Sequence, residues 1–177
     1  MKKILYSAFI LAAGLLSSCN DTDLGGPKNE VEKTATEALA GEWYVQAHGV
    51  DADDNILYED VYGAGTFEIL TYNTAANTAS KMFVDDETNF WEFKGEVNCN
   101  IENLTFSATG ISNAYYESSF DITEGKILLG AATSSYGHKV DSICFRLLLD
   151  DDDYAGKYYD HLLVTGYRRT GFDQGED

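Results

Sequence analysis

Positive charge is scarce in this chain of 177 residues. Lysine and arginine together number 12 against 30 aspartates and glutamates, which gives a formal net charge of −18 at pH 7. A surface this acidic repels phosphate backbones, so the composition excludes a nucleic-acid-binding protein. It also disfavours docking on a membrane through a polybasic patch. Apolar residues make up 44% of the chain, as in globular proteins, so disorder throughout is excluded.

Motifs of common enzymes and metal sites are missing as well. The chain has no Gly-x-Ser-x-Gly elbow of the esterases and no His-Glu-x-x-His of the zinc proteases. Its three histidines, His48, His138 and His161, do not stand at metal-ligand spacing. We therefore expect no catalytic residue, no metal and no cofactor. A triad assembled from distant residues stays open, because triads are defined by geometry.

Two acidic segments have the composition of calcium sites. Asp51, Asp53 and Asn55 begin like a calcium-binding loop, but Ile56 stands at the sixth position, where such a loop needs glycine. The second segment is the run 150–153, which consists of four aspartates. We interpret it as a solvated loop between two strands, with weak surface binding of Ca²⁺ as the minor alternative.

The longest apolar run of the chain is too short to cross a membrane. It covers residues 4–16 behind Lys2 and Lys3, whereas a transmembrane helix needs roughly 20 residues. This pattern is typical of a secretory signal peptide. The run ends in Leu16-Ser17-Ser18-Cys19, which resembles the lipobox of bacterial lipoproteins. The resemblance implies that residues 1–18 are removed and that Cys19 is acylated, for example with palmitate, so that lipid anchors the protein to a membrane.

Residues 19–38 are expected to form an acidic, flexible tether. They contain Gly25-Gly26-Pro27 and many polar side chains. Asp21 and Asp23 follow Cys19 closely and resemble the export signal of Bacteroidetes lipoproteins. This resemblance implies an outer-membrane lipoprotein exposed at the cell surface, with the periplasmic face of that membrane as the alternative. A short helix over residues 30–40 is expected to end the tether.

From Glu42 onward, apolar and polar residues alternate with the period of half-buried strands. The pattern predicts eight to ten strands, including one that carries Trp91 and Phe93 on the same face. Thr123-Glu124-Gly125-Lys126 is interpreted as a tight hairpin turn. Short connections favour an all-β, antiparallel up-and-down barrel over residues 39–171, with a sandwich as the alternative. An acidic tail follows at 172–177.

Large aromatic side chains recur on the apolar face of these strands. If that face points into a closed barrel, it lines a lumen that either binds one small ligand or is filled by its own side chains. The first alternative predicts a site for an apolar or amphipathic, lipid-like molecule that is bound without being transformed. The candidate residues for lining this cavity are Phe67, Trp91, Phe93, Phe106 and Phe120.

The domain begins with Gly41-Glu42-Trp43 and ends with Arg168 and Arg169. This combination resembles lipocalins and other calycin barrels, in which a late arginine packs over an early tryptophan. The resemblance implies that Trp43 and Arg168 close one end of the barrel. Together with the lipobox, the chain is similar over about residues 37–170 to Bacteroidetes lipoproteins known as "lipid-binding putative hydrolases". That family implies a calycin-like barrel and an apolar ligand, and no catalytic residue carries over.

Two cysteines remain once Cys19 is acylated. In an exported protein Cys99 and Cys144 could form a disulfide. They could equally be free, partly buried thiols that act as small apolar groups. The sequence leaves both alternatives open.

Twelve tyrosines supply the alternative function, because several cluster near predicted strand ends. A tyrosine offers an apolar face and a polar tip, which suits sugar stacking and protein interfaces. A cell-surface module that binds glycans or proteins is therefore the second hypothesis, although β-proteins are rich in tyrosine for structural reasons as well. A hydrolase is the third, on the family name alone. The clusters are Tyr115-Tyr116, Tyr136, Tyr154 and Tyr158-Tyr159.

We predict that Cys19→Ala moves the protein from the membrane to the soluble fraction, because the substitution removes the acyl chains. Cell fractionation and incorporation of labelled palmitate measure the change. A variant that still partitions with membranes, beside a wild type that takes up no palmitate, would contradict the anchor.

Overall fold

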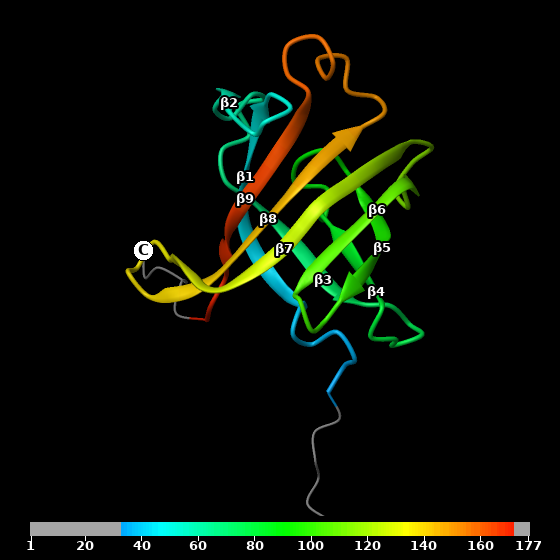
Figure 1. Ribbon diagram of the computed structural model, residues 1–177, viewed down its shortest axis with the longest axis vertical. Coiled ribbons are helices and arrows are strands. Elements are labelled where there is room, and N and C mark those ends of the chain that lie inside the picture. The colour runs from blue at the N-terminus through cyan, green and yellow to red at the C-terminus, as the bar shows by residue number, and fades with distance from the viewer. Residues whose placement is uncertain (1–32, 172–177) are drawn as a thin grey trace, which may run out of the picture. The chain divides into compact units, whose positions relative to one another are not determined.

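The computed structural model describes residues 33–171, which form one all-β domain (Figure 1). No helix occurs within these bounds, and therefore none that could cross a membrane. The predicted signal peptide, the first part of the tether with Cys19, and the tail 172–177 lie outside the described residues. The strands are β1 (Gly41–Val50), β2 (Ile56–Tyr58), β3 (Phe67–Asn73), β4 (Lys81–Asp85), β5 (Lys94–Asn100), β6 (Thr105–Ser112), β7 (Ser119–Thr133), β8 (Lys139–Leu149) and β9 (His161–Arg168).

The sheet closes on itself. Each strand from β3 to β9 pairs antiparallel with the next, and β9 returns to pair with β1 from Trp43↔Arg168 to Val50↔His161. Eight strands therefore make a closed up-and-down barrel, and the short β2 pairs only with the end of β1. Closure leaves these strands without open edges, as the alternation of the sequence predicted. The predicted barrel is confirmed over the predicted sandwich.

Side chains from every strand of the barrel fill its interior. Two aromatic pairs cross the lumen, Phe93 with Phe120 at 5.5 Å between ring centroids and Phe106 with Phe145 at 5.8 Å. A Cβ added to Gly95 would stand 2.1 Å from Ile111 Cγ2, so even a methyl group would not fit there. An eight-stranded barrel either is filled by its own side chains or holds one small ligand. Of the two alternatives for the lumen, the structure has the packed one.

An arginine and a tryptophan meet at the end where the chain enters the barrel. The Arg168 guanidinium lies 4.4 Å from the centre of the Trp43 ring and donates a hydrogen bond of 2.6 Å to the Ala40 carbonyl. Below it, Trp43 Nε1 donates to Thr71 Oγ1 at 2.9 Å. A Cβ on Gly41 would come within 2.5 Å of Arg168 Nη1. The glycine of Gly-x-Trp is therefore needed for this close approach.

The predicted hairpin at 123–126 is wrong, because β7 runs straight through it. The register passes from Thr123↔Arg146 to Lys126↔Cys144, so one extra residue of β7 is accommodated as a β-bulge. Gly125 is required by packing here, since its Cβ would stand 2.5 Å from the Phe106 ring. The glycine thus marks a close contact inside the sheet instead of a turn.

Two local expectations near strand ends also fail. Trp91 does not lie on a strand, because the buried Asp86 carboxylate accepts hydrogen bonds from the backbone of Thr88, Phe90 and Trp91 and folds the segment before β5 into a loop. Residues 33–40, the described part of the expected helix, form turns that bring Leu39 into the core.

We predict that Trp43→Ala lowers the free energy of unfolding by about 3–5 kcal/mol, the usual cost of truncating a fully buried large aromatic. Trp91→Ala is the control, because Trp91 is partly exposed and its loss should cost clearly less. Urea unfolding followed by circular dichroism measures both. Equal midpoints for Trp43→Ala and wild type would show that the closed end does not stabilise the barrel.

Candidate functional site

The two ends of the barrel differ sharply in composition. Strands alternate in direction, so the connections 51–66, 86–93, 113–118 and 150–160 all lie at one end, opposite the entry of the chain (Figure 1). We call these four segments the aromatic end. They hold ten aromatic residues and fourteen acidic residues, with Lys157 as their single basic residue. The connections 74–80, 101–104 and 134–138 at the other end hold one aromatic residue, Tyr136, and one acidic residue, Glu102.

A buried aspartate ties two loops of the aromatic end together. Asp152 is 8% exposed and accepts hydrogen bonds from the hydroxyls of Tyr62 and Tyr159, which also contact each other at 2.7 Å between oxygens. The backbone nitrogens of Tyr154 and Ala155 donate to the same carboxylate at 2.9 and 3.3 Å. Burial raises the pKa of both tyrosines above the ordinary value, so both stay protonated and keep donating near neutral pH.

The neighbouring Asp151 holds two further loops. It accepts from Trp91 Nε1 at 2.9 Å and from the Tyr116 hydroxyl at 2.7 Å. The Trp91 ring then meets Tyr62 edge to face, with 4.7 Å between ring centroids. Consecutive aspartates of one loop therefore fix aromatic rings contributed by the other three segments. The result is a preorganised aromatic surface.

Two open grooves run between these rings. The tyrosine groove has a volume of about 340 Å³ and is lined by Tyr58, Val61, Tyr154, Tyr158 and Tyr159. The Trp91 groove has a volume of about 400 Å³ and is lined by Phe90, Trp91, Glu92 and Tyr116.

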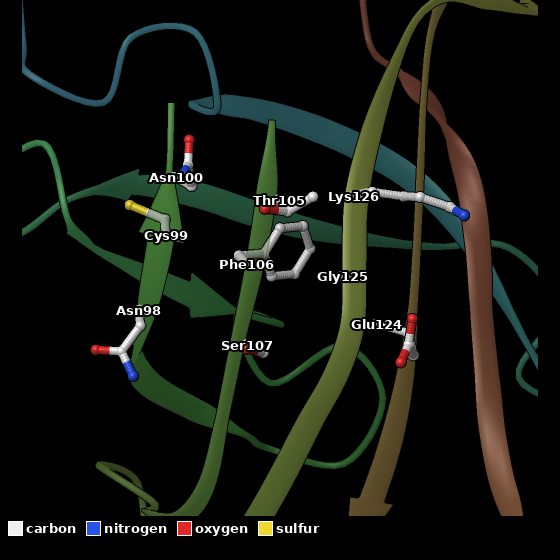
Figure 2. Close-up of a pocket in the computed structure, with 9 residues that line it drawn as sticks. All are labelled: Asn98, Cys99, Asn100, Thr105, Phe106, Ser107, Glu124, Gly125 and Lys126. Atoms are coloured by element: carbon white, nitrogen blue, oxygen red, sulfur yellow. The ribbon is translucent and has the colours of Figure 1, made fainter. Parts of the chain in front are cut away.

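A hollow of about 400 Å³ on the barrel wall has a different character (Figure 2). It crosses β5, β6 and β7, and Figure 2 shows the Phe106 ring directed toward Gly125 between the last two strands. Phe106 is buried, so the hollow offers mainly amides, hydroxyls, Glu124 and Lys126. More than half of its lining surface is polar. The other lining residues are Asn98, Cys99, Asn100, Thr105 and Ser107.

The five aromatic residues proposed from the sequence do not form one site. Four of them, Phe67, Phe93, Phe106 and Phe120, lie in the packed core with exposed fractions of 0–6%. Their rings pack against other side chains and leave no space for a ligand between them. Trp91 alone reaches the rim of the barrel, where it lines a groove.

Cys99 and Cys144 are free thiols in the structure. They lie on β5 and β8, with β6 and β7 between them, which is too far around the barrel for a disulfide bond. Partial burial raises the pKa of both thiols, so neither is an activated nucleophile.

No group of three or more metal-ligating side chains occurs in residues 33–171. His161 does meet a carboxylate, since its Nε2 lies 2.8 Å from Asp54 Oδ1. Arg146 donates hydrogen bonds to both oxygens of that carboxylate, at 2.8 and 2.6 Å. Its hydrogen bonds hold the pKa of Asp54 below the ordinary value. This cluster clamps the 51–55 turn onto the barrel wall and has the character of an ion pair.

We predict that Asp152→Ala lowers the free energy of unfolding by about 1–3 kcal/mol, because buried tyrosine and backbone donors lose their acceptor. Asp153→Ala is the matched control, since Asp153 is exposed in the same loop and should change stability little. Urea unfolding of the two variants measures the difference. Equal stability of the two variants would contradict the bracing role of Asp152.

Comparisons with known proteins show which family the chain belongs to. A search of curated proteins finds no match. A crystal structure of a structural-genomics protein of unknown function from Bacteroides ovatus resembles the chain with a TM-score of 0.41 and 14% sequence identity. The match covers 74% of this chain and 42% of that one, so the chain spans less than half of that protein. The family model described as "Lipid-binding putative hydrolase" matches residues 28–173. With this match over most of its length, the chain belongs to that lipid-binding family, as the resemblance of its sequence implied.

Proposed function

We propose that this protein is an outer-membrane lipoprotein, anchored through acylated Cys19, that binds an amphipathic, lipid-like ligand at the aromatic end and does not transform it. The observation that carries the proposal is the contrast between a packed interior and two open aromatic grooves at one end. Ligand sites are concave and mostly apolar, with a few fixed polar groups. The grooves of the aromatic end have that composition, and the family supports a lipid as the ligand.

Tyrosine and tryptophan suit an amphipathic ligand, because each combines an apolar ring with a polar tip. The rings of Tyr58, Tyr154 and Tyr158 are 44–50% exposed, so they offer apolar surface without unfolding any part of the barrel. The chain enters at the Trp43 end, so an anchor upstream of residue 33 joins the domain at the end opposite the grooves.

Binding without chemistry agrees with the hydrogen bonds that Asp151 and Asp152 already accept. A general base needs a free lone pair and access to its substrate. Asp152 already accepts four hydrogen bonds, and Asp151 accepts two from the rings that it positions. Both carboxylates therefore act as supports of the surface.

A surface module for glycans or proteins is the second candidate, and the exposed tyrosines favour it. Tyrosine faces stack on sugars as well as on alkyl chains, and the same rim would serve either ligand. The two candidates differ in the probe that binds, so one experiment separates them.

We predict that the neutral dye N-phenyl-1-naphthylamine binds the mature protein with one-to-one stoichiometry. Tyr154→Ala should weaken binding about tenfold, because a large aromatic wall of the groove is lost. Tyr136→Ala is the matched control, since Tyr136 is 51% exposed against 50% for Tyr154 but lies at the opposite end. Fluorescence titration measures both variants.

Equal weakening by the two substitutions would place the dye away from the aromatic end. If the folded protein binds no apolar probe at all, the lipid-like ligand is wrong and the glycan- or protein-binding module takes its place.

A further inference from the structure

We propose that the ligand of the tyrosine groove carries an organic cation, a quaternary ammonium or alkylammonium headgroup. This inference rests on the proposed function and specifies the chemistry of its ligand. It follows from three features of the aromatic end that point the same way: its charge, its exposed rings and the position of Lys157.

The charge of the aromatic end selects the sign of the headgroup. The four segments of the aromatic end contain fourteen acidic residues and one lysine. Clefts with charge of one sign concentrate the opposite ion and repel ions of their own sign. Fatty-acid carboxylates and lipid phosphates, the usual charged groups of lipids, are therefore disfavoured here. The groups that remain are neutral or positively charged.

The tyrosine groove supplies the contact that an organic cation prefers. A cation above an aromatic face is attracted by the negative centre of the ring, and cages of such rings recognise quaternary ammonium groups. Four of the five residues that line the groove are tyrosines, and Tyr58, Tyr154 and Tyr158 expose about half of their surface. Val61 adds an apolar wall for the first methylenes of an attached chain.

Lys157 already makes this contact within the chain. Its Nζ lies 4.7 Å from the centre of the Tyr158 ring, which lines the groove. The single basic residue of the aromatic end therefore stands on the ring that a cationic ligand would use. We therefore expect Lys157 to compete with an ammonium ligand for this ring.

A metal ion fits this end poorly. Residues 33–171 contain no cluster of three metal ligands. The carboxylates of Asp151 and Asp152 are engaged by tyrosine, tryptophan and backbone donors. The groove presents the faces of tyrosine rings in a region of negative electrostatic potential. This favours a weakly hydrated organic cation over a strongly hydrated metal ion.

Three amphiphiles with the same eight-carbon chain test the inference. Octyltrimethylammonium, octyl sulfate and octyl glucoside are titrated below their micelle concentrations and followed by calorimetry. We expect the cation to bind at least tenfold more tightly than the other two, with an affinity that falls as salt rises. Equal or tighter binding of the sulfate or the glucoside overturns the cationic headgroup and leaves the lipid-like ligand intact. Binding of none of the three overturns both proposals.

The variant Lys157→Met tests whether Lys157 competes with the ligand for Tyr158. If Lys157 competes for Tyr158, its removal tightens octyltrimethylammonium binding about threefold or more, whereas Tyr158→Leu weakens it about tenfold. Tyr136→Leu at the opposite end is the control and should change nothing. If Lys157→Met leaves the affinity for octyltrimethylammonium unchanged or lowers it, Lys157 does not compete for Tyr158 and the inference is wrong. Circular dichroism shows that each variant is folded.

Tetramethylammonium chloride separates a headgroup from a free cation. It should displace octyltrimethylammonium at concentrations where sodium chloride of equal ionic strength does not. Equal affinities of the two ammonium compounds identify a free cation as the ligand and remove the alkyl chain from it. Displacement no better than that by sodium chloride contradicts a cation site.

Discussion

The pairing of β9 with β1 is the constraint on which the rest of the structure depends. It fixes a closed barrel of eight strands, and with it the interior volume available to a ligand. Phe93, Phe120 and Phe145 occupy that volume with other large side chains, and Gly95 has no room even for a methyl group. These packed side chains exclude the lumen as a ligand site and leave the surface and the two ends.

The same up-and-down topology makes the two ends different. Alternate connections meet at the same end, so four segments far apart in the sequence combine their tyrosines, tryptophan and acids. The other end receives the entering chain and the contact between Trp43 and Arg168. One end thus closes the barrel. At the other end, hydrogen bonds to Asp151 and Asp152 hold the aromatic rings in place. The contact between Trp43 and Arg168 and the proposed binding surface therefore lie at opposite ends of the barrel.

Alternation of apolar and polar residues predicts the half-buried strands, and the short connections between them predict the barrel. The failures occurred where tertiary packing overrides local pattern. In the sequence, Gly125 indicates a turn. In the structure, its lack of a side chain allows the Phe106 ring to pack against it. Trp91 fits the alternation of the strand that follows, but hydrogen bonds to Asp86 fold its segment into a loop.

The site was harder to predict than the fold, since its residues meet only in three dimensions. The sequence emphasised aromatic residues inside strands, and those became the core. The sequence predicts Tyr154 and Tyr158 as part of a surface for glycans or proteins, and Asp152 as part of a solvated acidic loop. A usable signal was present, because an up-and-down barrel implies that alternate connections share an end. Adding their aromatic and acidic residues would have found the site.

We propose that ligand binds at the aromatic end and leaves the packed interior unchanged. Nuclear magnetic resonance of backbone amides and isoleucine methyl groups, recorded during titration with octyltrimethylammonium, tests it most directly. We expect chemical-shift changes of the backbone amides only in the segments 51–66, 86–93, 113–118 and 150–160. The methyl signals of Ile69 and Ile143 should stay unchanged. Large shifts of those interior methyl groups, with the four segments unaffected, would contradict it.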